Sequence, residues 1–477
     1  MTKSKYAVNR GIVMRYHTAQ HDSVKGRFVC RLAEALHYPA MSLFLYNLLL
    51  PFVMLVYLPA FTIKMVRRGG GWRHLVERFG IFTSTQRVAL RQLHAPVWVH
   101  AVSVGEVVAA LEFIRRWRER RPELEVLLSV TTTTGHATAQ ARLPERVRLI
   151  YCPLDFHFTV RRVMRLVRPR LLVIFEVEIW PNLIAAAARA GVPVALANGR
   201  LSDRSARGYR RFAWFFRPLF RRFSLLCVQS EADAERLRAV TGPDAPIHVC
   251  NTMKFDQTPD QTQRDANATL DAVFGSGPRL VFTAGSTHPG EEEAVVDAFL
   301  KLKPDSPRLK LVLVPRHHER TAQVEAVLRG RGLAWRLLKA PPADATATRA
   351  PAPAADVLLV NTTGELMRFY GVADVAFVGK SFAGNHGGHN IIEPAIFAKP
   401  VLHGPNLENF RQVAEIFRRD HASIEVADAD ALANTLRALL ANPAEREAFG
   451  RRARATVERH RGAIARTLDL LEPLTAP

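Results

Sequence analysis

Residues 171–182 read LLVIFEVEIWPN, an apolar run that ends in two glutamates. An apolar run without alternating polar residues is typical of a strand that is buried on both faces of a sheet. Similar short runs recur along the chain after residue 90, and amphipathic segments with apolar residues on one helical face separate them. This alternation predicts an α/β fold built from parallel strands.

The apolar runs fall into two series. The first series is VWVHAV (97–102), LEVLLSV (124–130), VRLIY (147–151), LLVIFEVEI (171–179), VPVALAN (192–198) and SLLCVQ (224–229). The second series is RLVFTAGS (279–286), LKLVLVP (309–315), DVLLVN (356–361), DVAFVG (374–379) and KPVLHG (399–404). We therefore expect two Rossmann-like, doubly wound domains that face each other across a cleft, with ligands at the carboxyl ends of the strands. Neither series carries Gly-x-Gly-x-x-Gly after its first strand or a Walker lysine, which disfavours nicotinamide and P-loop chemistry.

Changes in composition suggest the domain boundaries. We expect an N-terminal domain over residues 64–250 and a C-terminal domain over 279–455, joined by a polar, proline-bearing linker at 251–278. The charged amphipathic segment that ends in residues 456–477 predicts a terminal helix packed across both domains. An Ala/Pro/Thr-rich run, 341–356, is expected to be a solvent loop.

A membrane segment precedes these domains. Residues 39–63 are free of charge and long enough to cross a hydrocarbon core, so we expect a membrane anchor, with a spanning helix favoured. Pro51 and Pro59 would kink such a helix, so an anchor lying in the interface stays open. Residues 1–38 are predicted to be a basic, loosely ordered extension. The basic residues that follow the segment slightly favour a cytoplasmic position for the two domains, by the positive-inside rule.

The composition limits the classes of partner. The 477-residue chain has a formal net charge of +22, which suits an anionic lipid surface or a phosphorylated or carboxylated substrate. Nucleic acid is disfavoured, because no zinc-finger or RNA-recognition signature is present and aromatic residues do not alternate with the basic ones. The four cysteines contain no Cys-x-x-Cys pair, so neither a disulfide framework nor a zinc site is indicated. Cys152 and Cys227 are expected to be buried.

Glu106, Glu176 and Lys254 are the candidate catalytic groups. The first two lie near strand ends of the first half, and Lys254 lies in the connection that follows it. Glu106 of HAVSVGEVVAA follows the first strand and enters the first turn of a helix, where it is either a general base or a simple N-terminal cap. Alternation places Glu176 and Glu178 on one face of their strand, and buried carboxylates need partners or a function. Lys254 of NTMKFD is either a functional cation or an exposed lysine on a linker.

The second half offers groups for binding an anion. Arg316 of PRHHER is expected at a strand end, where a guanidinium suits a phosphate. The TTGEL segment and the loop GNHGGHNIIEP (384–394) each lead into a helix start with free N–H groups. In the loop, glycines 387 and 388 allow close backbone approach, the helix beginning near Asn390 would offer its N–H groups to a phosphate, and Glu393 is placed for a ribose.

A metal site is a second interpretation of the same loop. His389 and Glu393 are four residues apart and could chelate, and His386 lies nearby. No third ligand follows at a fitting spacing, so we expect no metal.

Eight motifs in order, SVGE, EVEIWPN, LSDRSARGY, MKFD, AGSTHPGEEE, VPRHHER, TGEL and GGHNIIEP, resemble those of the 3-deoxy-D-manno-octulosonic acid (Kdo) transferases of lipopolysaccharide biosynthesis. The resemblance covers nearly the whole chain from the apolar segment to the last helix. It implies a membrane-anchored, inverting GT-B glycosyltransferase at the cytoplasmic face of the inner membrane. The donor would be CMP-Kdo, the acceptor the lipid A precursor (lipid IVA), and no cofactor would be needed.

The resemblance also implies residue roles. Glu106 would be the general base, and Glu176 and Lys254 would stabilise the transition state. The contacts with CMP would come from Pro315, Arg316, Thr363, Gly364, Glu365, Asn390, Ile391, Ile392 and Glu393.

The sequence departs from the family pattern in three places. The loop SFAGNHGG is a residue longer than usual, which leaves the position of His386 open. Asn251 stands where a glycine commonly precedes the Lys-Phe-Asp motif, which could alter the turn, and Thr363 replaces a usual methionine. Two alternatives stay open. The first is another membrane-associated GT-B transferase that uses a nucleoside-diphosphate sugar, and the second is a non-enzymatic basic scaffold for acidic lipids.

Overall fold

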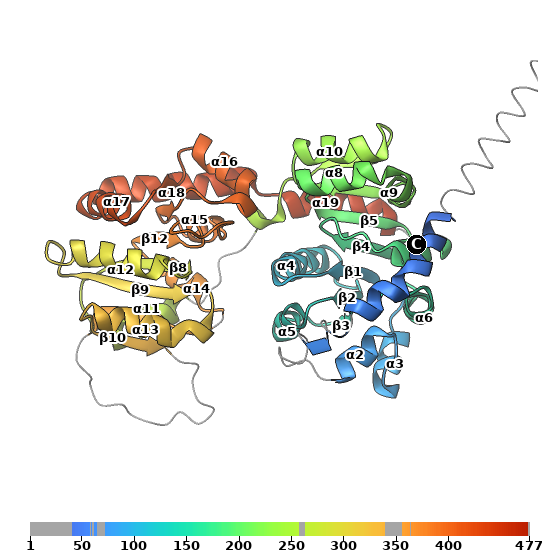
Figure 1. Ribbon diagram of the computed structural model, residues 1–477, viewed down its shortest axis with the longest axis horizontal. Coiled ribbons are helices and arrows are strands. Elements are labelled where there is room, and N and C mark those ends of the chain that lie inside the picture. The colour runs from blue at the N-terminus through green and yellow to red at the C-terminus, as the bar shows by residue number, and fades with distance from the viewer. Residues whose placement is uncertain are drawn as a thin grey trace, which may run out of the picture. The chain divides into compact units, whose positions relative to one another are not determined.

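The protein was analysed as a computed structural model, which describes residues 41–57, 59, 62–63, 72–256, 263–338, 355–362 and 364–475. The chain divides into two compact units (Figure 1). Unit 1 comprises the chain up to Met253 together with Gly462–Pro477, and unit 2 comprises Lys254–Arg461. The predicted basic extension, residues 1–38, lies outside the described residues, as does all of the predicted solvent loop at 341–356 except its last two residues.

Unit 1 is built on a parallel seven-stranded sheet with the order β3-β2-β1-β4-β5-β6-β7. The strands are β1 (Val97–Ala101), β2 (Val126–Val130), β3 (Val147–Tyr151), β4 (Leu171–Phe175), β5 (Val194–Gly199), β6 (Leu225–Val228) and β7 (Ile247–Val249). Its helices are α2 (Trp72–Arg78), α3 (Ser84–Arg91), α4 (Val104–Arg120), α5 (Thr133–Ala141), α6 (His157–Val167), α7 (Pro181–Arg189), α8 (Asp203–Arg211), α9 (Ala213–Phe220), α10 (Glu231–Thr241) and α19 (Ala463–Leu471).

Helices cover both faces of this sheet, which explains the unbroken apolar runs of its strands. On β1, Val97, Val99 and Ala101 pack with α4 and α19, whereas Trp98 packs with α6 and α7 on the opposite face. The alternation follows from the two-residue period of a strand. The predicted α/β class is therefore confirmed for this half.

Unit 2 repeats the architecture with the strand order β10-β11-β9-β8-β12-β13-β14, again all parallel. The strands are β8 (Leu280–Thr287), β9 (Leu309–Pro315), β10 (Trp335–Leu338), β11 (Val357–Val360), β12 (Val375–Val378), β13 (Val401–His403) and β14 (Ile424–Glu425). Its helical elements are η1 (Met253–Asp256), α11 (Gln263–Phe274), α12 (Glu291–Leu302), η2 (His318–Arg320), α13 (Thr321–Gly330), α14 (Leu366–Val372), α15 (Ile392–Ile396), η3 (Glu408–Phe410), α16 (Arg411–Arg419), α17 (Ala429–Ala441) and α18 (Pro443–His460).

The segment between the predicted domains differs from a plain linker. Residues 263–274 form helix α11, and Leu270 and Phe274 pack with Val281, Val312 and Phe369 in the core of unit 2. This burial makes α11 part of the second unit. Asn251 adopts a positive φ of 68°, a left-handed conformation that asparagine tolerates better than most residues. The turn before Lys254 therefore needs no glycine.

We expected a single helix at the end of the chain, but the structure has two. Helix α18 belongs to unit 2, and α19, which packs against α4 in unit 1, begins after Gly462 at a φ of 94°. Glycine reaches this left-handed conformation without steric cost, so the helix breaks there.

The predicted anchor is a helix over residues 41–57, followed by residues that the structure describes only in part. Among the described residues, no helix is both long and apolar enough to cross a bilayer. The expected spanning segment over residues 39–63 is therefore not confirmed.

Candidate active site

The strand order of unit 1 reverses between β1 and β4, because the chain first adds β2 and β3 on one side of β1 and then β4 on the other. In doubly wound sheets, ligands bind at the carboxyl ends of the strands that flank this switch point. Glu106 follows β1 and Glu176 follows β4 directly, so the fold brings these two predicted residues to one edge of the sheet.

Glu106 closes a capping box at the start of α4. Its carboxylate accepts the backbone N–H of Val102 at 2.8 Å and of Ser103 at 3.1 Å, while the Ser103 hydroxyl accepts the N–H of Glu106 at 3.3 Å. The side chain is buried. The capping alternative is thus correct as geometry, yet a carboxylate has about four acceptor sites, so two N–H bonds leave capacity for a substrate proton.

Glu176 and Glu178 lie beyond the end of β4 at Phe175, so the prediction that they share one face of a strand is wrong. Glu176 instead adopts a left-handed φ of 55°, a conformation that is costly for a residue with a Cβ atom. Its N–H is fixed by the carbonyl oxygen of Ala197 at 2.9 Å. Such strain collects at functional sites, where the surrounding structure holds it in place.

Glu178, which was singled out together with Glu176 but given no catalytic role, lies in the same segment after β4. Burial, followed by repulsion from the negative charges of Glu106 and Glu176, raises the pKa of Glu178 to about 7. Carboxyl groups that repel one another in a partly desolvated site titrate near neutral pH, a property of acid–base catalysts. We call Glu106, Glu176 and Glu178 the acidic cluster.

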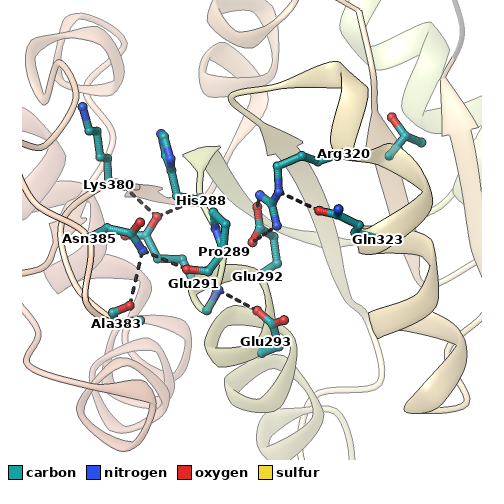
Figure 2. A network of polar contacts seen from close by, with 12 residues as sticks. His288, Pro289, Glu291, Glu292, Glu293, Arg320, Gln323, Lys380, Ala383 and Asn385 are labelled. Carbon is teal, nitrogen blue, oxygen red and sulfur yellow. Dashed lines mark hydrogen bonds and ion pairs between the residues drawn. The ribbon is translucent and has the colours of Figure 1, made fainter.

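In unit 2 the switch point lies between β8 and β12. Figure 2 shows the polar network there, centred on Glu291 at the first position of α12. One oxygen of its carboxylate accepts the N–H of His288 at 2.9 Å and of Lys380 at 2.7 Å, and the other accepts those of Ser381 at 2.8 Å and Phe382 at 3.2 Å. This completely buried group joins the loops that follow the two strands.

Basic side chains gather around this junction. Arg316, Lys380 and the imidazoles of His288, His317 and His389 influence one another electrostatically, and the Nε2 atoms of His288 and His389 are 3.2 Å apart. Burial, followed by repulsion from neighbouring charges, lowers the pKa of His288 to about 4 and that of His389 to about 3. We call these five residues the basic cluster. Both histidines are neutral at pH 7, so they can donate hydrogen bonds without adding charge.

Glu393 connects the basic cluster with Lys254. Burial raises the pKa of Glu393 to about 7, whereas the Asn390 amide, which donates to it at 3.3 Å, and the positive charges of Arg316 and Lys254 lower it. Lys254, whose Nζ lies 4.1 Å from the centre of the Phe410 ring, is therefore close to the predicted nucleotide-binding residues of unit 2. The isolated-linker alternative for Lys254 is wrong.

The other predicted nucleotide contacts lie at the ends of secondary structure elements. Pro315 ends β9, and Gly364, with a φ of 93°, and Glu365 precede α14, where Glu365 pairs with Arg368. Thr363 lies outside the described residues. Ile391 and Ile392 are buried, and the N–H of Ile392 is already bonded to the side-chain oxygen of Asn390 at 3.2 Å. We expected the helix near Asn390 to offer its N–H groups to a phosphate, but the N–H of Ile392 is bonded within the protein.

His386 lies apart from the basic cluster. It is exposed, and its Nδ1 atom is 3.3 Å from the carboxylate of Glu408, which also accepts the N–H of Gly387 at 2.6 Å. In the part of the chain that the structure describes, no three His, Cys, Asp or Glu side chains are grouped so that they could hold a metal ion.

Two doubly wound units with polar clusters at their switch points define the class: a two-domain, GT-B-like α/β fold. A solved glycosyltransferase from Rickettsia africae has the same fold, with a TM-score of 0.54, 12% identity, and coverage of 80% of this chain and 98% of that one. An Anabaena protein solved in complex with UDP matches similarly, with a TM-score of 0.52 and 13% identity over 80% of this chain and 99% of that one.

Sequence comparison identifies the family. The family model described as 3-deoxy-D-manno-octulosonic-acid transferase (kdotransferase) matches residues 73–257. The Kdo transferase of Bordetella pertussis is 35% identical, over 85% of this chain and 93% of the relative, and that of Haemophilus influenzae is 32% identical, over 84% and 91%. The chain belongs to the Kdo transferase family, and it is a glycosyltransferase of lipopolysaccharide biosynthesis.

Proposed function

We propose that the enzyme transfers Kdo from CMP-Kdo to the lipid A precursor, lipid IVA, with inversion at the anomeric carbon. The observation that carries this proposal is the composition of unit 2, where Lys254 and Arg316 lie near Glu393 beside a further lysine and three histidines. A nucleoside monophosphate ester of an acidic sugar presents a phosphate and a carboxylate, both of which need cations or N–H donors. The departing group carries one phosphate rather than a diphosphate, so the reaction does not demand a metal.

In the proposed mechanism, Glu106 accepts the proton of the acceptor sugar hydroxyl as that oxygen forms a bond to the anomeric carbon of Kdo. The bond between this carbon and the phosphate oxygen breaks, and CMP leaves with the electron pair. Arg316 and Lys254 offset the charge that develops on the phosphate, while Glu176 stabilises the oxocarbenium-like transition state. The CMP contacts are assigned to Pro315, Arg316, Thr363, Gly364, Glu365, Asn390, Ile391, Ile392 and Glu393.

We place the enzyme at the inner membrane with its catalytic units on the cytoplasmic face. Support comes from the helix at residues 41–57, which exposes large apolar side chains, including Phe44 at 68% and Leu55 at 75%. Apolar exposure of this extent suits a lipid interface.

Competition between nucleotides tests the donor assignment. We expect CMP to inhibit Kdo transfer and to protect unit 2 from proteolysis, and UDP to do neither at the same concentration. Equal protection by UDP would favour a nucleoside-diphosphate sugar. A mass-spectrometric count of sugars added to lipid IVA tests the acceptor in the same preparation.

A further inference from the structure

A cavity of about 430 Å³ lies between the helix at residues 41–57 and the carboxyl edge of the first sheet. The helix contributes Tyr46, Leu50, Val53, Met54 and Tyr57, which lie on one face because they follow the spacing of an α-helix. The opposite wall is largely apolar and is formed by Cys152, Pro153, Leu154, Phe156 and Trp180. The volume falls in the range of about 300–1,000 Å³ that is typical of small-molecule sites.

Specific polar contacts hold the helix over this cavity. The Tyr46 hydroxyl donates to the Asp155 carboxylate at 3.0 Å, and the Asn47 amide donates to the side-chain oxygen of Asn182 at 3.0 Å. Asp155 also accepts the N–H groups of Asn182 and Leu183, each at 2.9 Å. The helix is therefore docked in a defined position, and the polar group of Asp155 already has its partners within the protein.

The other charged group of the lining is also engaged. Arg78 is buried, donates to the carbonyl oxygen of Thr131 at 2.6 Å, and lies 4.3 Å from the centre of the Tyr151 ring. Because most of the lining side chains are apolar, the cavity offers its occupant mainly hydrocarbon and aromatic surface. An apolar occupant gains most from such a lining, since polar atoms would lose their hydration there.

The cavity adjoins the acidic cluster. It is lined by residues that follow β2, β3 and β4, and β1, which leads to Glu106, lies between β2 and β4 in the sheet. Trp180 is two positions after Glu178, and the negative charge of Glu178 contributes to the raised pKa of the Cys152 thiol. A molecule with a sugar hydroxyl at Glu106 could therefore reach the cavity with an attached chain.

The outer face of the same helix is apolar and exposed. Phe52 is 67% exposed and Val56 is 75% exposed, whereas Leu50 on the cavity side is 7% exposed. Val53 and Tyr57, which line the cavity, are themselves 49% and 67% exposed, so the cavity opens beside this apolar face. An occupant could enter from a lipid phase without passing through water.

We propose that this cavity holds one hydrocarbon chain of the lipid acceptor and thereby selects acceptors by chain length. The proposal rests on the proposed function, because it assigns a part of the acceptor to a part of unit 1. It makes the helix at residues 41–57 a wall of the acceptor site in addition to its proposed role at the interface.

The test compares acceptors that carry the same phosphorylated disaccharide and differ only in acyl-chain length. The full-length enzyme is assayed in mixed micelles with CMP-Kdo, and kcat/KM is plotted against chain length. Met54→Trp should occupy part of the cavity and shift the optimum to shorter chains, and Met54→Ala should shift it to longer chains. Each methylene that is excluded changes kcat/KM about fourfold, so the loss of two methylenes should lower kcat/KM for the long-chain acceptor about fifteenfold.

Leu48→Trp is the matched control, because Leu48 is 53% exposed on the same helix and does not line the cavity. It should leave the chain-length profile of the wild type unchanged. If Met54→Trp and Met54→Ala both gave the same dependence of kcat/KM on chain length as Leu48→Trp, the cavity would not hold the chain. If Met54→Trp fails to fold, Val53→Trp tests the shift to shorter chains, and Met54→Ala still tests the shift to longer chains. Absence of Kdo transfer by the wild type to any acceptor would instead refute the proposed function, so the two failures are distinguishable.

Discussion

Replacing Glu291 by glutamine should destabilise the loops that meet at the switch point of unit 2. The Glu291 carboxylate accepts four backbone N–H groups, two on each oxygen, from His288 on one loop and from Lys380, Ser381 and Phe382 on the other. Figure 2 labels Glu291 with His288 and Lys380. Glutamine has a single carbonyl oxygen. Whichever way its amide is turned, two buried N–H donors face an NH₂ group that cannot accept a hydrogen bond.

The size of the effect follows from these two donors. An unsatisfied buried donor costs about 1–3 kcal/mol, so two of them would cost roughly 2–6 kcal/mol. Removing a buried charge returns part of this cost, because burial raises the pKa of Glu291 and thus disfavours its charged form. We expect a net loss of about 2–4 kcal/mol in the free energy of unfolding of unit 2.

Two measurements check this expectation. Urea unfolding should show the loss in the transition of unit 2, and hydrogen exchange should show faster exchange of the amides of residues 380–382. Glu293→Gln is the matched control on the same helix, because Glu293 caps only the N–H of Gly290, at 2.9 Å, and glutamine keeps that capping ability. A loss below about 1 kcal/mol for Glu291→Gln, with unchanged exchange at residues 380–382, would refute the account of the network.

Three further predictions concern the two clusters and the glycine loop. Glu106→Ala should lower the rate of Kdo transfer about 10²- to 10⁴-fold while calorimetric CMP binding persists, because a general base acts in the chemical step; near-normal transfer by the purified variant would remove the base assignment. Gly388→Ala should reduce CMP affinity, since Gly388 has a φ of +65° and an added Cβ would lie 2.2 Å from Leu407 Cδ2. The control is Gly208→Ala, because Gly208 has open space around it. Equal CMP affinity in both variants would contradict the prediction. The stability of unit 2 should fall as the pH drops from 7 to 5, because unfolded histidines bind protons near pH 6.5 whereas folded His288 and His389 resist protonation until about 4 and 3. Urea midpoints at the two pH values measure this loss, and His389→Asn should reduce it; an unchanged pH dependence in that variant would show that His389 does not cause it.

The strands that the sequence predicts are the central ones of each sheet and one edge strand, β3. Runs such as 171–179 and 309–315 are apolar throughout because helices cover both faces, and this pattern is visible without a structure. The missed strands β7, β10 and β14 all lie at sheet edges, where a strand has one neighbour and can be short and partly polar. The end of β4 was misjudged for a different reason. The apolar residues Val177 and Ile179 continue past Phe175, although the left-handed φ of Glu176 ends the strand.

The position of a candidate residue could be predicted where it closely follows a strand, as Glu106 and Arg316 do. It could not be predicted where the partner is distant in sequence. Glu291 binds the backbone of residues about 90 positions later, and backbone N–H groups leave no signature in a sequence. The histidines of the basic cluster were visible in AGSTHPGEEE and PRHHER, but only the fold brings His288 next to His389.

The distribution of charge between the units follows the order of events in sugar transfer. Within unit 1, the acidic cluster holds three carboxyl groups, and burial, followed by repulsion from Glu106 and Glu176, raises the pKa of Glu178 to about 7. Within unit 2, burial raises the pKa of Glu393 to about 7, against the positive charges of Arg316 and Lys254, and Lys380 acts with Arg316 on His389. In the proposed mechanism, the acidic cluster supplies a carboxylate that accepts the proton, and the cations of unit 2 stabilise the departing phosphate.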